Sequence, residues 1–150
     1  MAERHKIIPA SYLILIRGDK ILLLKRSNTG FEDGNYSFVA GHVEADETFT
    51  ETMIREAKEE AGIDLRAEDM KMVHMMHRRS SQNDEERVDA FFMAEKWGGE
   101  IKNMEPEKCS DLGWFDLDNL PDNIIPYIKK VVKEVINKNN YSEYGWGRKE

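Results

Sequence analysis

The sequence has a single cysteine, Cys109, and four prolines, none of which falls between residues 10 and 105. One cysteine excludes an intrachain disulfide, so we expect the protein to work in the reducing cytosol. No apolar run approaches the ~18 residues that span a bilayer, which excludes a helical membrane anchor within the sequence. Basic residues are also in the minority, 22 against 29 acidic ones. That balance predicts neither membrane nor nonspecific nucleic-acid binding, both of which favour a basic surface.

A length of 150 residues suits one domain. The sequence contains no internal repeat, low-complexity tract or linker, so we predict a single domain over residues 1–150. Its core is expected at about residues 10–137. The C-terminal tail, residues 138–150, could cover a site or pack on a partner subunit.

Hydrophobic periodicity predicts an α/β fold with mixed strands and two main helices. Residues 10–17 and 20–26 resemble a hairpin that turns at Gly18-Asp19. The remaining strands are expected at 36–39, 70–78, 87–96 and 112–117, and the helices at 48–61 and 123–137. Thr48 and Glu51 have the spacing of a capping box, and Gly62 suits the end of the first helix.

The first predicted helix concentrates the negative charge. Residues 44–60 hold seven acidic and two basic residues. At 100° per residue, Glu56, Glu59 and Glu60 share one face of the helix. The apolar face opposite would dock onto a sheet; it consists of Met53, Ile54, Ala57 and Ala61.

This acidic face admits two interpretations. Like charges at i, i+4 cost only about 0.2–0.5 kcal/mol per pair, so crowded glutamates on a solvated helix need no ligand. Carboxylate oxygens are also the ligands of Mg²⁺, which keeps positions open for substrate phosphates. Arg55 lies four residues from both Glu51 and Glu59 and could orient the carboxylates.

The surrounding residues favour the metal site. Residues 41–63 read GHVEADETFTETMIREAKEEAGI, and the chain resembles the Nudix hydrolases in this segment. It matches their signature G-x5-E-x7-R-E-U-x-E-E-x-G-U, in which U is aliphatic. At roughly 7% usage per residue type, seven fixed identities match by chance on the order of once in 10⁸ positions. Val39 and Ala40 stand where the family usually has Pro-Gly, and alanine allows fewer backbone conformations than glycine.

The resemblance implies an α/β/α sandwich around a mixed sheet and a metal-dependent enzyme. Mg²⁺, or Mn²⁺ in its place, would be held by Ala40 through its carbonyl and by Glu56, Glu59, Glu60 and Glu105. Arg55 and Glu47 would support these ligands. Glu107, Glu85 and Glu86 are alternatives to Glu105 as the acid from a late loop, and the general base would be Glu56 or Glu105.

The implied reaction is hydrolysis of a nucleoside diphosphate linked to another moiety. Sequence marks of ADP-ribose, dinucleoside polyphosphate and NADH enzymes are absent, which favours a (deoxy)nucleoside triphosphate, cleaved to monophosphate and pyrophosphate. A nucleotide sugar or other diphosphate, and a non-catalytic nucleotide sensor, are the alternatives. Phe31 and Trp97 could stack on a base, and Arg78 and Arg79 could bind phosphate, although packing and plain surface roles compete for these residues. Many relatives form homodimers, so a homodimer is also expected.

Overall fold

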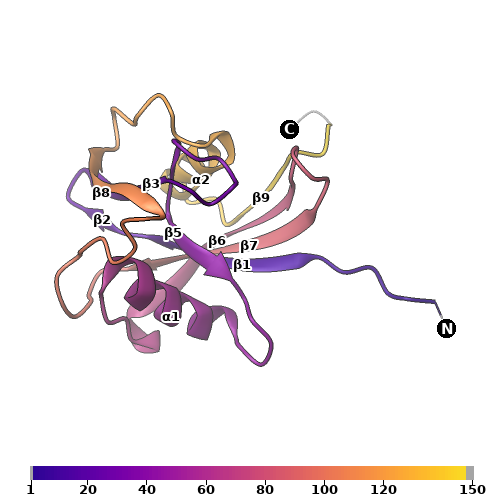
Figure 1. Ribbon diagram of the computed structural model, residues 1–150, viewed down its shortest axis with the longest axis horizontal. Coiled ribbons are helices and arrows are strands. Elements are labelled where there is room, and N and C mark those ends of the chain that lie inside the picture. The colour runs from indigo at the N-terminus through magenta and orange to yellow at the C-terminus, as the bar shows by residue number, and fades with distance from the viewer. Residues whose placement is uncertain (1, 148–150) are drawn as a thin grey trace.

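Two β-sheets and two helices form the fold in the computed structural model, which describes residues 2–147 (Figure 1). The larger sheet has the strand order β5 (Val39–His42), β1 (Ile8–Ile14), β7 (Glu86–Ala94), β6 (Met70–Arg79), β9 (Tyr141–Tyr144). In the smaller sheet, β3 (Lys20–Arg26) pairs with β2 (Ile16–Arg17), β4 (Tyr36–Ser37) and β8 (Cys109–Asp116). The helices are α1 (Phe49–Ala61) and α2 (Pro126–Ile136), with a 3-10 turn η1 at Ala67–Asp69.

The helices cover opposite faces of the larger sheet. Helix α1 packs on β1 and β5 through Met53, Ala57 and Ala61, all fully buried. Helix α2 packs on the other face, next to β6 and β9, where Ile128 and Val131 are fully buried. The smaller sheet closes both cores with Leu22 and Leu24 on the α1 side and Ile21 and Leu23 on the α2 side. This arrangement confirms the predicted α/β/α sandwich around a mixed sheet.

Helix α1 begins and ends where its sequence predicts. The Thr48 side chain accepts a hydrogen bond from the Glu51 backbone N–H, and the Glu51 side chain accepts one from the Thr48 N–H. Such a cap satisfies backbone groups that the first turn leaves unpaired and contributes about 1 kcal/mol. Gly62 ends the helix with φ 70°, a left-handed conformation that glycine adopts without strain.

The predicted hairpin at residues 10–26 is wrong over most of its length. Only Ile16 and Arg17 pair with β3 as a hairpin, whereas β1 pairs in parallel with β7 and antiparallel with β5. The chain crosses from one sheet to the other at Leu15, which is fully buried. A continuous apolar run fits a central strand as well as a hairpin arm, so the sequence alone did not reveal the crossover.

The C-terminal tail contributes a strand that sequence periodicity did not predict. Strand β9 pairs in parallel with β6, and the His74 imidazole contacts Ser142 Oγ at 2.7 Å and the Asn139 carbonyl at 2.8 Å. Beyond β9, Trp146 donates its indole N–H to the His77 carbonyl. The last part of the predicted tail, residues 148–150, lies outside the described residues. No helix within residues 2–147 has the length and apolar character needed to cross a membrane.

Candidate functional site

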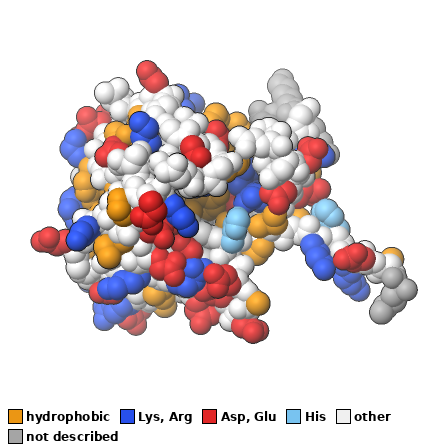
Figure 2. All heavy atoms as spheres, viewed as in Figure 1, with side chains coloured by type: hydrophobic (Ala, Val, Ile, Leu, Met, Phe, Trp, Pro, Cys, Tyr) orange, Lys and Arg blue, Asp and Glu red, His pale blue; other side chains and the backbone are white. Residues whose placement is uncertain are grey.

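A cavity of about 520 Å³ lies between the two sheets, and helix α1 contributes one of its walls. Its acidic wall consists of Glu56, Glu59, Glu60 and Glu105, and its basic residues are Arg26, Arg78, Arg87 and Lys108. Figure 2 shows acidic side chains gathered over α1, beside a hollow in this face of the molecule. The cavity therefore brings opposite charges to its two sides, which suits a ligand with a cation-bound anionic part and a polar remainder.

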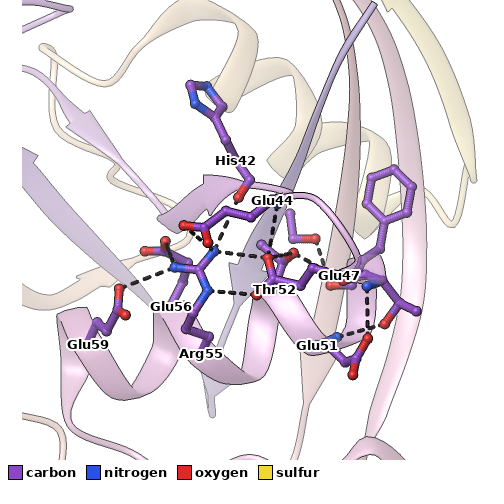
Figure 3. Close-up of polar contacts among 11 residues, drawn as sticks. His42, Glu44, Glu47, Glu51, Thr52, Arg55, Glu56 and Glu59 are labelled. Carbon is purple, nitrogen blue, oxygen red and sulfur yellow. Dashed lines mark hydrogen bonds and ion pairs between the residues drawn. The ribbon is translucent and has the colours of Figure 1, made fainter.

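Arg55 organises the acidic wall. Its guanidinium contacts Glu47 through two N–H groups, at 2.7 and 3.0 Å, and Glu56 at 2.6 Å. A fourth contact reaches Glu59 at 3.3 Å (Figure 3). The prediction that Arg55 also holds Glu51 is wrong, because Glu51 turns back to cap the helix. Planar arginine holds several carboxylates in fixed directions, which a single ammonium group would not do.

Glu47 is anchored from three directions. Besides Arg55, the Thr52 hydroxyl donates to it at 2.5 Å and the Glu44 backbone N–H at 3.1 Å. These hydrogen bonds lower the pKa of Glu47 to about 2, with the contact to Arg55 as the largest cause. The same ion pair raises the pKa of Arg55 above its ordinary value. Glu47 is thus a permanent anion that fixes the arginine rather than a group free to exchange protons.

Gly41 makes room for Glu56. A Cβ atom at residue 41 would overlap the Glu56 carboxyl group, so any side chain there would displace the carboxylate. The backbone at Gly41 has an ordinary conformation. The signature glycine is therefore required here for space and not for an unusual φ.

Glu60 is the most deeply buried acid of the wall, and its carboxylate accepts a hydrogen bond from the Ala40 N–H at 3.1 Å. Burial raises the pKa of Glu60 well above its ordinary value, and the negative charge of Glu56 raises it further. Ala40 lies within strand β5 and is not among the described residues with positive φ. Alanine in place of the family's usual glycine thus introduces no backbone strain.

Glu105 reaches the cavity from the loop before β8. The Glu60 carbonyl accepts from the Met104 N–H, and the Ala61 carbonyl accepts from the Lys102 N–H, which ties this loop to the end of α1. Burial raises the pKa of Glu105, and the charges of Glu56 and Glu59 act in the same direction. The alternatives Glu107, Glu85 and Glu86 do not line the cavity; Glu85 and Glu86 pair instead with Arg87 and His5.

The acidic wall has the donor chemistry of a hard divalent cation. Carboxylate oxygens are the ligands that Mg²⁺ and Mn²⁺ prefer, and the buried Glu60 next to Glu56 creates a site in which a proton or a cation is favoured. Within residues 2–147, no three such side chains already surround one point. Their oxygens turn to Arg55 and to the Ala40 N–H, so binding a cation requires small side-chain rotations.

The structure separates the four residues predicted to bind substrate. Phe31 and Arg78 line the cavity, and both also line a second cavity of about 340 Å³. Arg79 lines only the second cavity. Trp97 lies outside both, because it packs with Trp114 on either side of the Arg17 guanidinium. The position of Trp97 does not match the predicted base contact.

Sequence reasoning missed part of the basic side of the cavity. Arg87 and Tyr12 line it from β7 and β1, and Tyr127 lines it from α2. One signal was available: Arg87 and Asp89 alternate with apolar residues at the start of an otherwise hydrophobic strand. Charged residues on the buried side of such a strand indicate a polar cavity floor.

Comparison with known proteins follows the same lines. The NUDIX domain family matches residues 7–135. An NAD-capped RNA hydrolase NudC from Stutzerimonas stutzeri is 34% identical over 77% of this chain, and that match spans 39% of the relative. An ADP-ribose pyrophosphatase from Methanocaldococcus jannaschii is 31% identical over 85% of this chain and 72% of the relative. The chain thus spans about two fifths of the length of the NudC relative.

Solved structures share the fold. A MutT NUDIX hydrolase from Burkholderia pseudomallei superposes with a TM-score of 0.80 at 27% identity, covering 87% of this chain and 99% of that one. A bifunctional NMN adenylyltransferase/ADP ribose pyrophosphatase from Francisella tularensis, complexed with AMP and a Mn ion, superposes with a TM-score of 0.72 at 18% identity. It covers 93% of this chain and 44% of that one. The family match over residues 7–135, carried by the glutamate-rich helix and its arginine, shows that this chain belongs to the Nudix hydrolase family.

Proposed function

We propose that the protein is a metal-dependent pyrophosphohydrolase that cleaves a nucleoside diphosphate linked to another moiety. The observation that carries this proposal is the Arg55 cluster, in which one guanidinium holds Glu47, Glu56 and Glu59 at the wall of a cavity. No signature carboxylate is lost. That argues against the alternative of a non-catalytic nucleotide sensor, which would be expected to lack one.

Glu56, Glu59 and Glu60, with the Ala40 carbonyl and Glu105, would hold Mg²⁺ or Mn²⁺. The bound cation would neutralise the charge that develops on the phosphoryl oxygens. Arg55 keeps Glu56 and Glu59 in place, so the carboxylates need little reorganisation. On the opposite side, Arg26 and Lys108 can contact the remaining phosphate oxygens.

Glu105 is the better candidate for the general base. A carboxylate held at 2.6 Å by an arginine, as Glu56 is, is a weak base because the arginine stabilises its charged form. Burial raises the pKa of Glu105, and among the described residues it forms no salt bridge. Glu105 can therefore accept a proton from the water that attacks phosphorus.

Two lines of evidence favour different substrates. The sequence marks favour a (deoxy)nucleoside triphosphate, whereas the relatives are named for NAD-capped RNA and ADP-ribose. All of these contain a nucleoside diphosphate, and this is the substrate class that we propose. The expectation that the protein avoids nucleic acid is restricted accordingly: net charge −7 opposes nonspecific binding but does not exclude the 5′ end of an RNA.

A product-release assay tests the proposal. The panel would hold normal and oxidised triphosphates, ADP-ribose, NAD, an NAD-capped oligoribonucleotide, dinucleoside polyphosphates and nucleotide sugars, each with Mg²⁺, Mn²⁺ or EDTA. We expect cation-dependent turnover by the wild type, and loss of turnover in Glu59→Gln. The exposed Glu68, which pairs only with Arg66, provides the matched control Glu68→Gln. Turnover that survives in EDTA would contradict the mechanism, and silence across the panel with intact cation binding would favour a sensor.

A further inference from the structure

Two buried polar atoms on the cavity floor have no hydrogen-bond partner. They are Arg87 Nε, a donor, and Asp89 Oδ1, an acceptor, and they are the only such side-chain atoms within residues 2–147. Both belong to strand β7 and are two residues apart, so they point to the same face of the sheet. Buried polar atoms in native proteins are almost always paired, so two adjacent exceptions in one cavity call for an explanation.

Sheet register places Asp89 in the middle of the cavity floor. Its partner on β1 is Ala10, and Tyr12, Arg78 and Arg87 are the neighbouring residues on the same face. All four of these neighbours line the cavity. Because Ala10 carries only a methyl group, the floor is low beside the Asp89 carboxylate, which is itself fully buried.

The rest of both side chains is held in place. Asp89 Oδ2 accepts from Arg78 Nε at 2.8 Å, and the Arg78 guanidinium lies 3.8 Å from the centre of the Tyr127 ring. Arg87 contacts His42 Nε2 through Nη1 and Glu85 through Nη2, each at 2.9 Å. These contacts leave one acceptor and one donor unpaired, in fixed positions.

The pair of atoms selects the chemistry of a ligand. A phosphate or carboxylate would be repelled by Asp89 and offers no donor, and an amine or a metal cation would be repelled by Arg87. A neutral group with an acceptor next to a donor satisfies both atoms. The amide edge, C=O beside N–H, has this pattern, and Arg prefers a carbonyl oxygen as acceptor.

We infer that Arg87 and Asp89 form a specificity site for an amide edge on the non-reacting part of the substrate. The edge comes either from a lactam base such as hypoxanthine, guanine or uracil, or from a nicotinamide carboxamide. The inference rests on the proposed function for its place in a reaction, because the acidic wall would hold the diphosphate while the floor reads the group beyond it. Selectivity for the amide can be measured without any turnover.

Binding of nucleoside monophosphates in EDTA isolates this site from the metal and from catalysis. One arm compares inosine 5′-monophosphate with purine riboside 5′-monophosphate, which lacks both the C6 oxygen and the N1 proton. The other compares nicotinamide mononucleotide with nicotinic acid mononucleotide, in which a carboxylate replaces the amide. By titration calorimetry, we expect the wild type to prefer the amide partner by at least about 10-fold in one arm, the effect of a hydrogen bond to a charged group. The arm that shows the preference identifies the source of the amide.

Two variants separate recognition from structural support. Arg87→Met removes the donor and should reduce the preference to below about 3-fold. In Asp89→Asn, Arg78 can only donate, so the asparagine oxygen must face Arg78 and its NH₂ group must face the ligand. The free acceptor becomes a donor, and the preference should shift toward purine riboside monophosphate, whose N1 accepts. A purely structural role predicts no such inversion.

The controls make each outcome decisive. Arg66→Met, at an exposed arginine paired with Glu68 and Asp69, should keep the wild-type preference. If Asp89→Asn does not fold, Arg87→Met alone decides. Equal binding within both wild-type pairs, no binding of any of the four ligands, or an unchanged preference in folded Arg87→Met would overturn the inference. Hydrolysis without amide selectivity would leave the proposed function intact, and amide selectivity without hydrolysis would leave this inference intact.

Discussion

The carboxyl group of Glu56 occupies the space in which a side chain at residue 41 would begin. Gly41 lies on strand β5 and Glu56 on helix α1, so this contact sets the distance between the helix and the sheet edge at the cavity. Glu56 is also held by Arg55 at 2.6 Å. A carboxylate fixed from both sides can be displaced by a single methyl group.

Gly41→Ala should therefore abolish most activity while leaving the protein folded. The new methyl group displaces Glu56, and misplacing a catalytic group by about 1 Å can cost on the order of 100-fold in rate. Activity and circular dichroism measured on the same sample would check this. The matched control is Gly113→Ala in β8, where the nearest atom to a new Cβ is 4.0 Å away. Equal activity of the two variants would refute the steric role of Gly41.

The Glu47–Arg55 pair should contribute to stability in a pH-dependent way. Folding lowers the pKa of Glu47 from 4.5 to about 2, so the folded state binds its proton more weakly than the unfolded state. The contribution is therefore fully present above pH 4.5 and is lost as the pH falls toward about 2. The free energy of unfolding of wild type minus that of Glu47→Gln should be constant near neutral pH and should shrink below pH 4.5. Urea denaturation at a series of pH values measures the difference, and a difference independent of pH would be inconsistent with the lowered pKa.

The buried Arg78–Asp89 pair should be costly to break from one side only. Both side chains are almost completely buried, with exposed fractions of 3% and 0%. Arg78→Met leaves the carboxylate unpaired and should destabilise the protein by about 3–5 kcal/mol. The double variant Arg78→Met/Asp89→Leu removes both charges and should recover much of that loss. Chemical denaturation of the two variants tests this, and a double variant less stable than Arg78→Met would contradict the expectation.

Local sequence predicts the parts of the site that local interactions build. Thr48, Glu51 and Gly62 fix the bounds of α1 through contacts within the helix, and the spacing of Glu56, Glu59 and Glu60 places them on one face. The structure confirms this capping and places all three glutamates at the cavity. The side chain opposite Arg55 that sequence spacing suggested, Glu51, is instead used by the cap.

The opposite side of the cavity depends on tertiary register, which spacing along the chain does not encode. Tyr12, Arg87 and Tyr127 meet because β1 pairs in parallel with β7 and α2 crosses the same face. Trp97 was predicted at the site because aromatic residues suit base stacking, but Arg17 holds it beside Trp114. Strand β9 was missed because a short polar segment forms a strand only when an edge such as β6 is available.

The acidic wall is the centre of the proposed mechanism, and Mn²⁺ binding tests it most directly. Electron paramagnetic resonance counts free Mn²⁺, and turnover of the best substrate can be followed in the same samples. We expect Glu56→Gln and Glu60→Gln to weaken Mn²⁺ binding by on the order of 10- to 100-fold and to lose turnover in parallel, whereas Glu68→Gln should match the wild type. Wild-type Mn²⁺ affinity in both cavity variants, or full turnover without a cation, would show that these glutamates do not form the metal site.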